Sequence, residues 1–166
     1  EADGVLSFGS KDGWWLMASL LHLGGGGVVV QPKVSYPTYG IGTQLAGAEV
    51  LKVDDVADVE SWKDVPGVKA VWVNSPCNPT GAVLAAEQMA AIVAAARGIG
   101  AVVLSDECYA LMQWGNVDVE ADADTLASTP CALRPDVCGG PAQGVLVLYS
   151  LSKQSNMAGY RTAFLS

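Results

Sequence analysis

The 166-residue sequence is poor in charged residues, and the charges it has are mostly acidic. Nine Lys and Arg residues stand against 17 Asp and Glu residues, which gives a formal net charge of −8. So few cations argue against nucleic acid as the main partner and against binding to an anionic membrane surface. A chain that is 51% hydrophobic and only 16% charged is also not an intrinsically disordered one.

Long apolar segments and metal-ligand patterns are missing as well. The longest apolar run, residues 89–96, is far shorter than the roughly 20 residues that a membrane-spanning helix needs. With His22 as the single histidine and no C-x-x-C pair, a zinc site of the usual spacing is not expected. No signal peptide opens the sequence, and scattered cysteines fit a reducing compartment. We therefore expect a cytoplasmic protein without a bound metal.

What is present is an alternation of apolar strands and amphipathic helices. Strands are predicted at Val28–Val30, Val50–Val53, Ala70–Val73, Ala101–Leu104 and Val145–Tyr149. Helices are predicted after the N-cap candidate Ser10, over Pro37–Ala46, and on the face formed by Met89, Ile92, Val93 and Ala96. Strands this apolar belong in a parallel sheet buried on both faces. The predicted fold is therefore α/β, a single domain with three αβα layers around a mostly parallel sheet.

Residues 115–144 differ in composition from the rest of the chain. An acidic run is followed by several prolines and glycines. This composition is typical of turns and solvated connections, so we expect a loop excursion here rather than a site.

Polar side chains follow three of the predicted strands, where ligands of parallel sheets bind. Asn78 follows one strand, Asp106 and Tyr109 follow the next, and Ser150, Ser152 and Lys153 follow the last. A fourth feature, Ser10 and Lys11 at the start of a helix, suits a phosphate because the first backbone N–H groups are free.

Each feature has a plain structural alternative. Residues 78–81 could be only a turn, Asp106 a helix cap, Tyr109 half-buried packing and Lys153 a surface lysine. The set is more specific than its members, because the order and the strand-end positions agree.

Three motifs together resemble the large domain of the class I/II pyridoxal-phosphate-dependent aminotransferases, which have fold type I. They are Asn-Pro-Thr-Gly at 78–81, Asp-x-x-Tyr at 106–109, and Ser-x-Ser-Lys at 150–153 followed by Arg161. The resemblance covers nearly the whole chain. Residues 35–39, 74–81 and 105–109 are most similar to succinyldiaminopimelate aminotransferases of actinobacterial type.

The resemblance implies a role for each matching residue. The catalytic residues would be Lys153, bonded to the cofactor aldehyde, Asp106 at the pyridine nitrogen, and Tyr109, which with Asn78 would hydrogen-bond the ring hydroxyl oxygen. The phosphate would be held by Ser150, Ser152 and Arg161 and by the backbone at Ser10 and Lys11. Tyr36 matches the aromatic residue that stacks on the cofactor ring.

The resemblance also implies an activity. The protein would move an amino group between an amino acid and a 2-oxo acid, with N-succinyl-diaminopimelate and glutamate/2-oxoglutarate as one candidate pair, and would act as a homodimer. Residues 1–166 would be an incomplete large domain without its N-terminal segment and C-terminal small domain, and inactive alone. A β-elimination lyase on the same scaffold and the ligand-sensing domain of a regulator remain alternatives.

Overall fold

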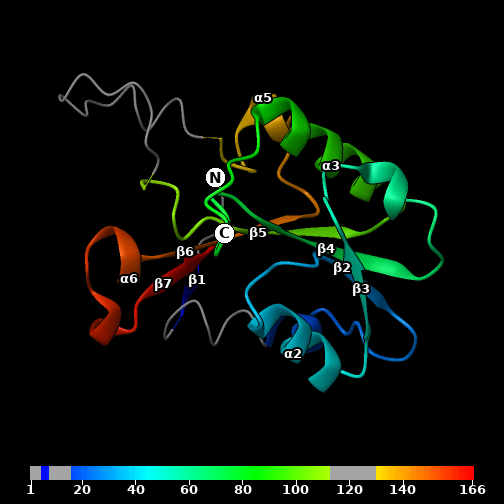
Figure 1. The fold of residues 1–166 in the computed structure, drawn as a ribbon, viewed down its shortest axis with the longest axis horizontal. Coiled ribbons are helices and arrows are strands. Elements are labelled where there is room, and N and C mark those ends of the chain that lie inside the picture. Colours follow the sequence, from blue (N-terminus) through cyan, green and yellow to red (C-terminus); the bar gives the residue numbers. More distant parts are fainter. Residues whose placement is uncertain (1–4, 8–15, 113–129) are drawn as a thin grey trace.

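The computed structural model describes residues 5–7, 16–112 and 130–166. Within them, seven strands form one sheet in the order β1-β7-β6-β5-β4-β2-β3. Helices lie on both faces of this sheet, with α3 and α5 above it and α2 below it in Figure 1. The predicted three-layer α/β fold is confirmed.

The central strands are parallel, and one end of the sheet is antiparallel. The parallel strands are β2 (Val28–Pro32), β3 (Glu49–Val53), β4 (Val68–Asn74), β5 (Val102–Asp106) and β6 (Val145–Ser150). The short strands β1 (Val5–Ser7) and β7 (Ala163–Leu165), which the sequence pattern did not predict, pair antiparallel at the other end.

The helices lie between the strands along the chain. They are α2 (Thr38–Leu45), α3 (Ala86–Gly98), α5 (Pro135–Cys138), α6 (Leu151–Gln154) and the 3₁₀ turns η1 (Val59–Ser61) and η2 (Ala158–Tyr160). Residues 16–20 are also helical, whereas the predicted N-cap Ser10 lies outside the described residues. Among the described residues, no helix is both long enough and apolar enough to cross a membrane.

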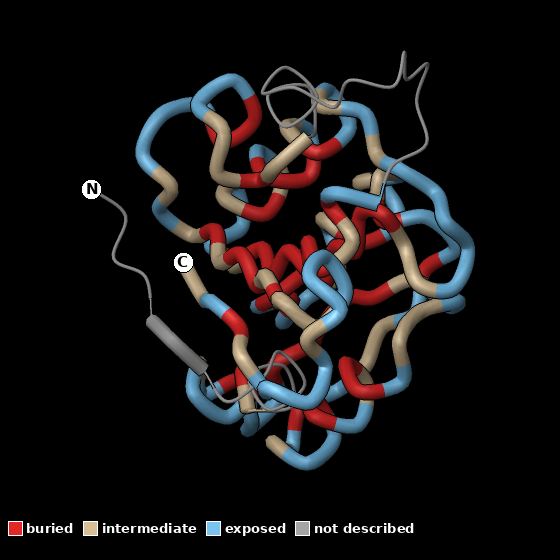
Figure 2. Tube along the Cα trace, turned by 90° about the vertical axis from the view of Figure 1, so that its left-hand side faces the viewer, coloured by how far each residue is buried: buried red, intermediate tan, exposed pale blue. Residues whose placement is uncertain are grey.

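Alternate residues of each central strand pack into different hydrophobic clusters. Val71 and Val73 of β4 belong to the cluster beneath α3, and Ala70 and Trp72 belong to the cluster on the opposite face. This alternation follows from the two-residue period of a strand, and it explains why the strands are apolar throughout. Figure 2 shows the buried residues gathered along the strands at the centre of the molecule.

The predicted strand–helix–strand unit is β4–α3–β5. Its strands pair in parallel from Ala70↔Val102 to Asn74↔Asp106. The predicted helix face of Met89, Ile92, Val93 and Ala96 is fully buried against the sheet. The helix predicted over Pro37–Ala46 is α2, and Gly47 follows it with a left-handed φ of 75°, which a residue with a side chain rarely adopts.

The expectation of a solvated excursion over residues 115–144 is wrong for residues 132–138, whereas residues 139–144 are mostly exposed and have neither helix nor strand. Residues 135–138 form α5, which starts with Pro135 at its first turn and packs against α3. Ala132, Val137 and Cys138 are buried in the α3-side core. Pro135 begins a helix rather than lying in a loop, because the fixed φ of proline suits the first helical turn.

Arg97, in the last turn of α3, fastens the segment that leads into β6. Its guanidinium donates to the backbone carbonyls of Cys138, Pro141 (2.7 Å) and Gln143 (2.9 Å). A planar group with several donors can satisfy three carbonyls at once, which a lysine ammonium does less well.

We predict that Arg97→Lys lowers the free energy of unfolding by about 1–3 kcal/mol, since most of these charge-assisted bonds are lost while the charge is kept. Urea denaturation measures the effect. Lys69→Arg, an exposed change on β4, is the control and should leave stability within about 0.5 kcal/mol of the wild type. Equal stability of all three proteins would show that these contacts contribute nothing.

Candidate active site

The carboxyl ends of β4, β5 and β6 meet at one edge of the sheet and form a pocket. Parallel pairing places Asn74 beside Asp106, and Asp106 pairs with Leu148, two residues before the end of β6. The pocket is lined by Tyr36, Asn78, Asp106, Cys108, Tyr109, Ser150, Ser152, Lys153, Ala158 and Arg161. Every predicted site residue in the described part of the chain is in this set. Ser10 and Lys11 lie outside the described residues.

Asp106 is the buried acid of the pocket, with 1% of its surface exposed. One carboxyl oxygen accepts a hydrogen bond from the Tyr39 hydroxyl, and the other accepts from the backbone N–H of Cys108 at 3.1 Å. Burial raises the pKa of Asp106 to about 6, although both hydrogen bonds act to lower it. A carboxyl group held this way can carry or release a proton near neutral pH.

Tyr39 is a site residue that the sequence reasoning missed. It lies on α2, is buried, and stacks on Trp72 with ring centroids 4.3 Å apart. Burial, and then the neighbouring Asp106, raises the pKa of its phenol, so Tyr39 stays a neutral donor to the carboxylate. The sequence signal that could have identified Tyr39 is its position three residues after Tyr36. The two rings pack edge to face, with their centroids 6.0 Å apart.

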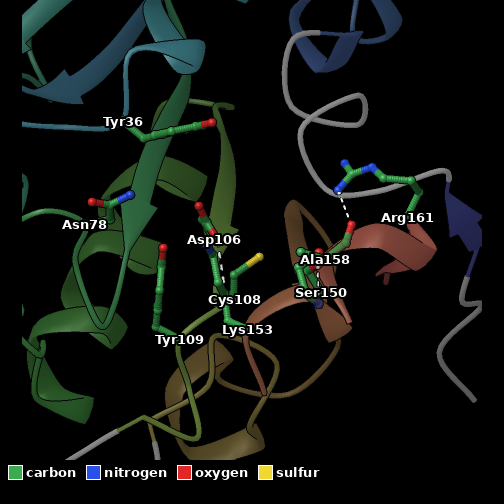
Figure 3. A pocket seen from close by; sticks show the side chains of 10 residues that line it. Tyr36, Asn78, Asp106, Cys108, Tyr109, Ser150, Lys153, Ala158 and Arg161 are labelled. Atoms are coloured by element: carbon green, nitrogen blue, oxygen red, sulfur yellow. Dashed lines mark hydrogen bonds between the residues drawn. The ribbon is translucent and has the colours of Figure 1, made fainter. Parts of the chain in front are cut away.

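Lys153 lies on α6, immediately after β6. Its side chain is exposed, and its Nζ lies 5.8 Å from the centre of the Tyr109 ring. Tyr109, from the turn after β5, is half-buried, so a phenol and an amine from two strand ends face the same space. Figure 3 shows Tyr36, Asn78, Asp106 and Tyr109 on one side of the pocket and Ser150, Ala158 and Arg161 on the other.

The second side of the pocket carries hydroxyls and a guanidinium. Ser150 is buried and caps α6, where its Oγ accepts from the backbone N–H of Ser152 at 3.1 Å. Arg161 is exposed and donates through Nη1 to the carbonyl of Ala158 at 3.0 Å. Its backbone is left-handed, with φ of 51°, a conformation uncommon for a residue with a side chain.

Comparison with known proteins places the chain in a family. The family model described as aminotransferase class I and II matches residues 1–166. The chain belongs to this family. Aminotransferases of the family use pyridoxal phosphate.

Two curated relatives are similar over most of the chain. A "Probable aminotransferase" of Mycobacterium tuberculosis is 39% identical over 99% of the chain and 36% of its own length. The 4-dedimethylamino-4-oxo-anhydrotetracycline transaminase OxyQ of Streptomyces rimosus is 40% identical over 92% of the chain and 38% of its own length. The chain thus spans well under half of these relatives.

A solved structure shows the same fold. The aminotransferase AspB of Helicobacter pylori superposes with a TM-score of 0.81 at 24% identity, over 99% of the chain and 43% of AspB. The aminotransferase-type α/β fold predicted from the sequence is confirmed.

The residues of the pocket fit pyridoxal phosphate. The buried Asp106 carboxyl suits a protonated pyridine nitrogen, because an ionised acid is stabilised by an opposite charge. The amine of Lys153 suits an aldehyde, and the Ser150, Ser152 and Arg161 side suits a phosphate. These three groups come from the ends of two adjacent strands and from the turn after them.

We predict that Asp106→Asn stabilises the cofactor-free protein at neutral pH. The pKa of Asp106 in the folded protein, about 6, lies above the ordinary aspartate value of 3.8, so the wild type loses stability as pH rises from about 4 to 6. The variant should gain up to about 3 kcal/mol relative to the wild type above pH ~6, and little near pH ~4.

Urea denaturation of both proteins at a series of pH values measures this difference. Asp54→Asn serves as the control, because Asp54 is exposed and pairs with Lys33 at the surface. A difference in the free energy of unfolding between Asp106→Asn and wild type that does not change with pH would contradict the assigned pKa.

Proposed function

We propose that the protein containing this chain is a pyridoxal-phosphate-dependent aminotransferase that moves an amino group between an amino acid and a 2-oxo acid. The observation that carries the proposal is the meeting of Asp106, Lys153 and Arg161 in one pocket of a family member. An acid, an amine and a cation with hydroxyls are the three groups that the cofactor's ring nitrogen, aldehyde and phosphate require.

When bound, pyridoxal phosphate would supply an aldehyde that bonds to amines and a ring that accepts electrons from the substrate Cα. Asp106 would hold a proton at the ring nitrogen, which strengthens that electron acceptance. Its two hydrogen bonds from Tyr39 and Cys108 favour the ionised carboxylate that this task requires.

The other pocket residues would hold and orient the cofactor. Asn78 and Tyr109 would donate to the ring hydroxyl oxygen, and Tyr36 would lie against the ring. Ser150, Ser152 and Arg161 would bind the phosphate, helped by the backbone at Ser10 and Lys11. Lys153, exposed and beside Tyr109, would bond to the aldehyde and, once displaced by a substrate amine, move a proton at the substrate Cα.

Three further proposals concern the whole protein. Residues 1–166 would form most of the large domain, and the length present in the relatives but outside this chain would include a small domain that binds the substrate carboxylate. The chain alone would then be inactive. The protein would act in the cytoplasm, which its scattered cysteines favour, and as a homodimer, which its family resemblance implies.

For the substrate we propose N-succinyl-diaminopimelate, with glutamate/2-oxoglutarate as the second amino-acid and oxo-acid pair. The support is the similarity of residues 35–39, 74–81 and 105–109 to succinyldiaminopimelate aminotransferases. OxyQ, which is 40% identical to the chain, is named for a different substrate, so the assay must compare both chemistries.

We predict that reduction of the cofactor-loaded protein with borohydride attaches pyridoxal phosphate to Lys153. Lys153→Ala should lose this label and lower kcat at least about 10²-fold, because the amine both bonds to the aldehyde and transfers a proton. Peptide mapping by mass spectrometry locates the label. The exposed Lys69→Ala is the control, and a label on Lys69 or Lys11 would contradict the assignment.

We predict that kcat/KM for amino transfer is highest with N-succinyl-diaminopimelate. N-succinyl-diaminopimelate, alanine, aspartate and aromatic amino acids are each assayed as amino donor with 2-oxoglutarate as acceptor. To complete the panel, a tetracyclic ketone is assayed as acceptor with glutamate as amino donor. Release of the matching oxo acid, or consumption of the ketone, measures each rate. A preference for any other member would retain the aminotransferase and refute the substrate, whereas elimination products without glutamate formation would refute aminotransfer.

A further inference from the structure

Asn74, the last residue of β4, is a buried amide with both of its polar ends in use. Only 7% of its surface is exposed, so its polar atoms would be costly to leave without partners. Its Nδ2 donates to the backbone carbonyl of Asp106 at 3.0 Å, and its Oδ1 accepts from the backbone N–H of Asn78 at 2.7 Å. One side chain therefore connects two residues of the pocket.

The two residues belong to different parts of the chain. Asp106 ends β5, whereas Asn78 lies in the loop that follows β4. That loop is partly closed on itself by bonds from the N–H of Cys77 to the carbonyl of Ala82 and from the N–H of Gly81 to the carbonyl of Cys77. The bond to Asn74 ties the loop, at Asn78, to the strand ends that carry the acid.

We propose that Asn74 is a positioning residue that sets the distance between the Asp106 carboxyl and the Asn78 side chain. The inference rests on the proposed function, in which these groups meet the ring nitrogen and the ring hydroxyl oxygen of one rigid cofactor. Because the cofactor ring cannot adjust, a change in the spacing weakens one contact or the other.

An asparagine suits this task by its shape. Its amide offers a donor and an acceptor at a fixed separation on a short stem, so it can satisfy a carbonyl on one side and an N–H on the other. Leucine has a similar size and neither polar atom. The carbonyl of Asp106 would keep its bond from the N–H of Ser75 at 3.3 Å, but the N–H of Asn78 would lose the Asn74 oxygen.

Ser75 provides a matched control in the same loop. It is buried, at 2% exposure, and its Oγ accepts from the N–H of Leu84 at 3.0 Å. Ser75→Ala removes one hydrogen bond from the loop without touching the Asn74 bridge. Comparable losses of stability are expected in the two variants, whereas effects on the cofactor should differ.

The test uses the protein that contains this chain, loaded with pyridoxal phosphate. The dissociation constant of the cofactor and the pH midpoint of its visible absorption band are measured in wild type, Asn74→Leu and Ser75→Ala. A donor at the ring oxygen favours the ionised form, so misplacing Asn78 moves the midpoint to higher pH. We expect this shift and an affinity loss of about tenfold in Asn74→Leu, with Ser75→Ala within about twofold of wild type.

A double-mutant comparison shows whether the effect passes through Asn78. In an Asn78→Ala background, Asn74→Leu should shift the midpoint much less than it does alone, because the group that it positions is already gone. An unchanged midpoint in Asn74→Leu, or an equal shift in both backgrounds, would overturn the inference. Where Asn74→Leu yields no folded protein, Asn74→Ser takes its place with the same expectations.

The same data separate this inference from the proposed function. A wild-type protein with no visible band in pyridoxal phosphate, and no label on Lys153, refutes the proposed function itself. A wild type that binds the cofactor normally, with Asn74→Leu behaving like Ser75→Ala, refutes only the role of Asn74.

Discussion

The buried carboxyl group of Asp106 is the constraint around which the site is arranged. An acid at 1% exposure needs donors, and the molecule supplies them from two elements: the Tyr39 hydroxyl from α2 and the Cys108 backbone from the turn after β5. Tyr39 is in turn held by its stack on Trp72 of β4. The helix on one face, two strands and a turn are therefore tied to the position of one carboxylate.

Ionisation of the carboxyl group at this buried position is unfavourable in the absence of a cation. Burial raises the pKa of Asp106 to about 6, so the ionised form is disfavoured in the cofactor-free protein. A protonated ring nitrogen would relieve this cost by adding an opposite charge where solvent is excluded. The burial that lowers the stability of the cofactor-free protein would thus favour binding of the cofactor, which is a common trade between stability and function.

Much of the fold could be predicted from the sequence, because its signals are local. Apolar runs such as Ala70–Val73 identify buried strands, and the spacing of Met89, Ile92, Val93 and Ala96 identifies the helix between two of them. The segment at Pro135 was misjudged, since proline and glycine occur both in loops and at helix ends. The short antiparallel strands β1 and β7 have no period long enough to detect.

The residues of the candidate site also include some that local sequence patterns predict and some that they do not. The local pattern was enough to place Asn78, Asp106, Ser150 and Lys153 at or just after strand ends, because apolar runs and the turns after them are recognisable in the sequence. The contact of Tyr39 from α2 with the Asp106 carboxylate, and the bridge of Asn74 from Asp106 to Asn78, are visible only in the folded chain. The contacts from Tyr39 to Asp106 and from Asn74 to Asp106 join residues 67 and 32 positions apart, and such contacts depend on sheet register and helix packing, which no local pattern encodes.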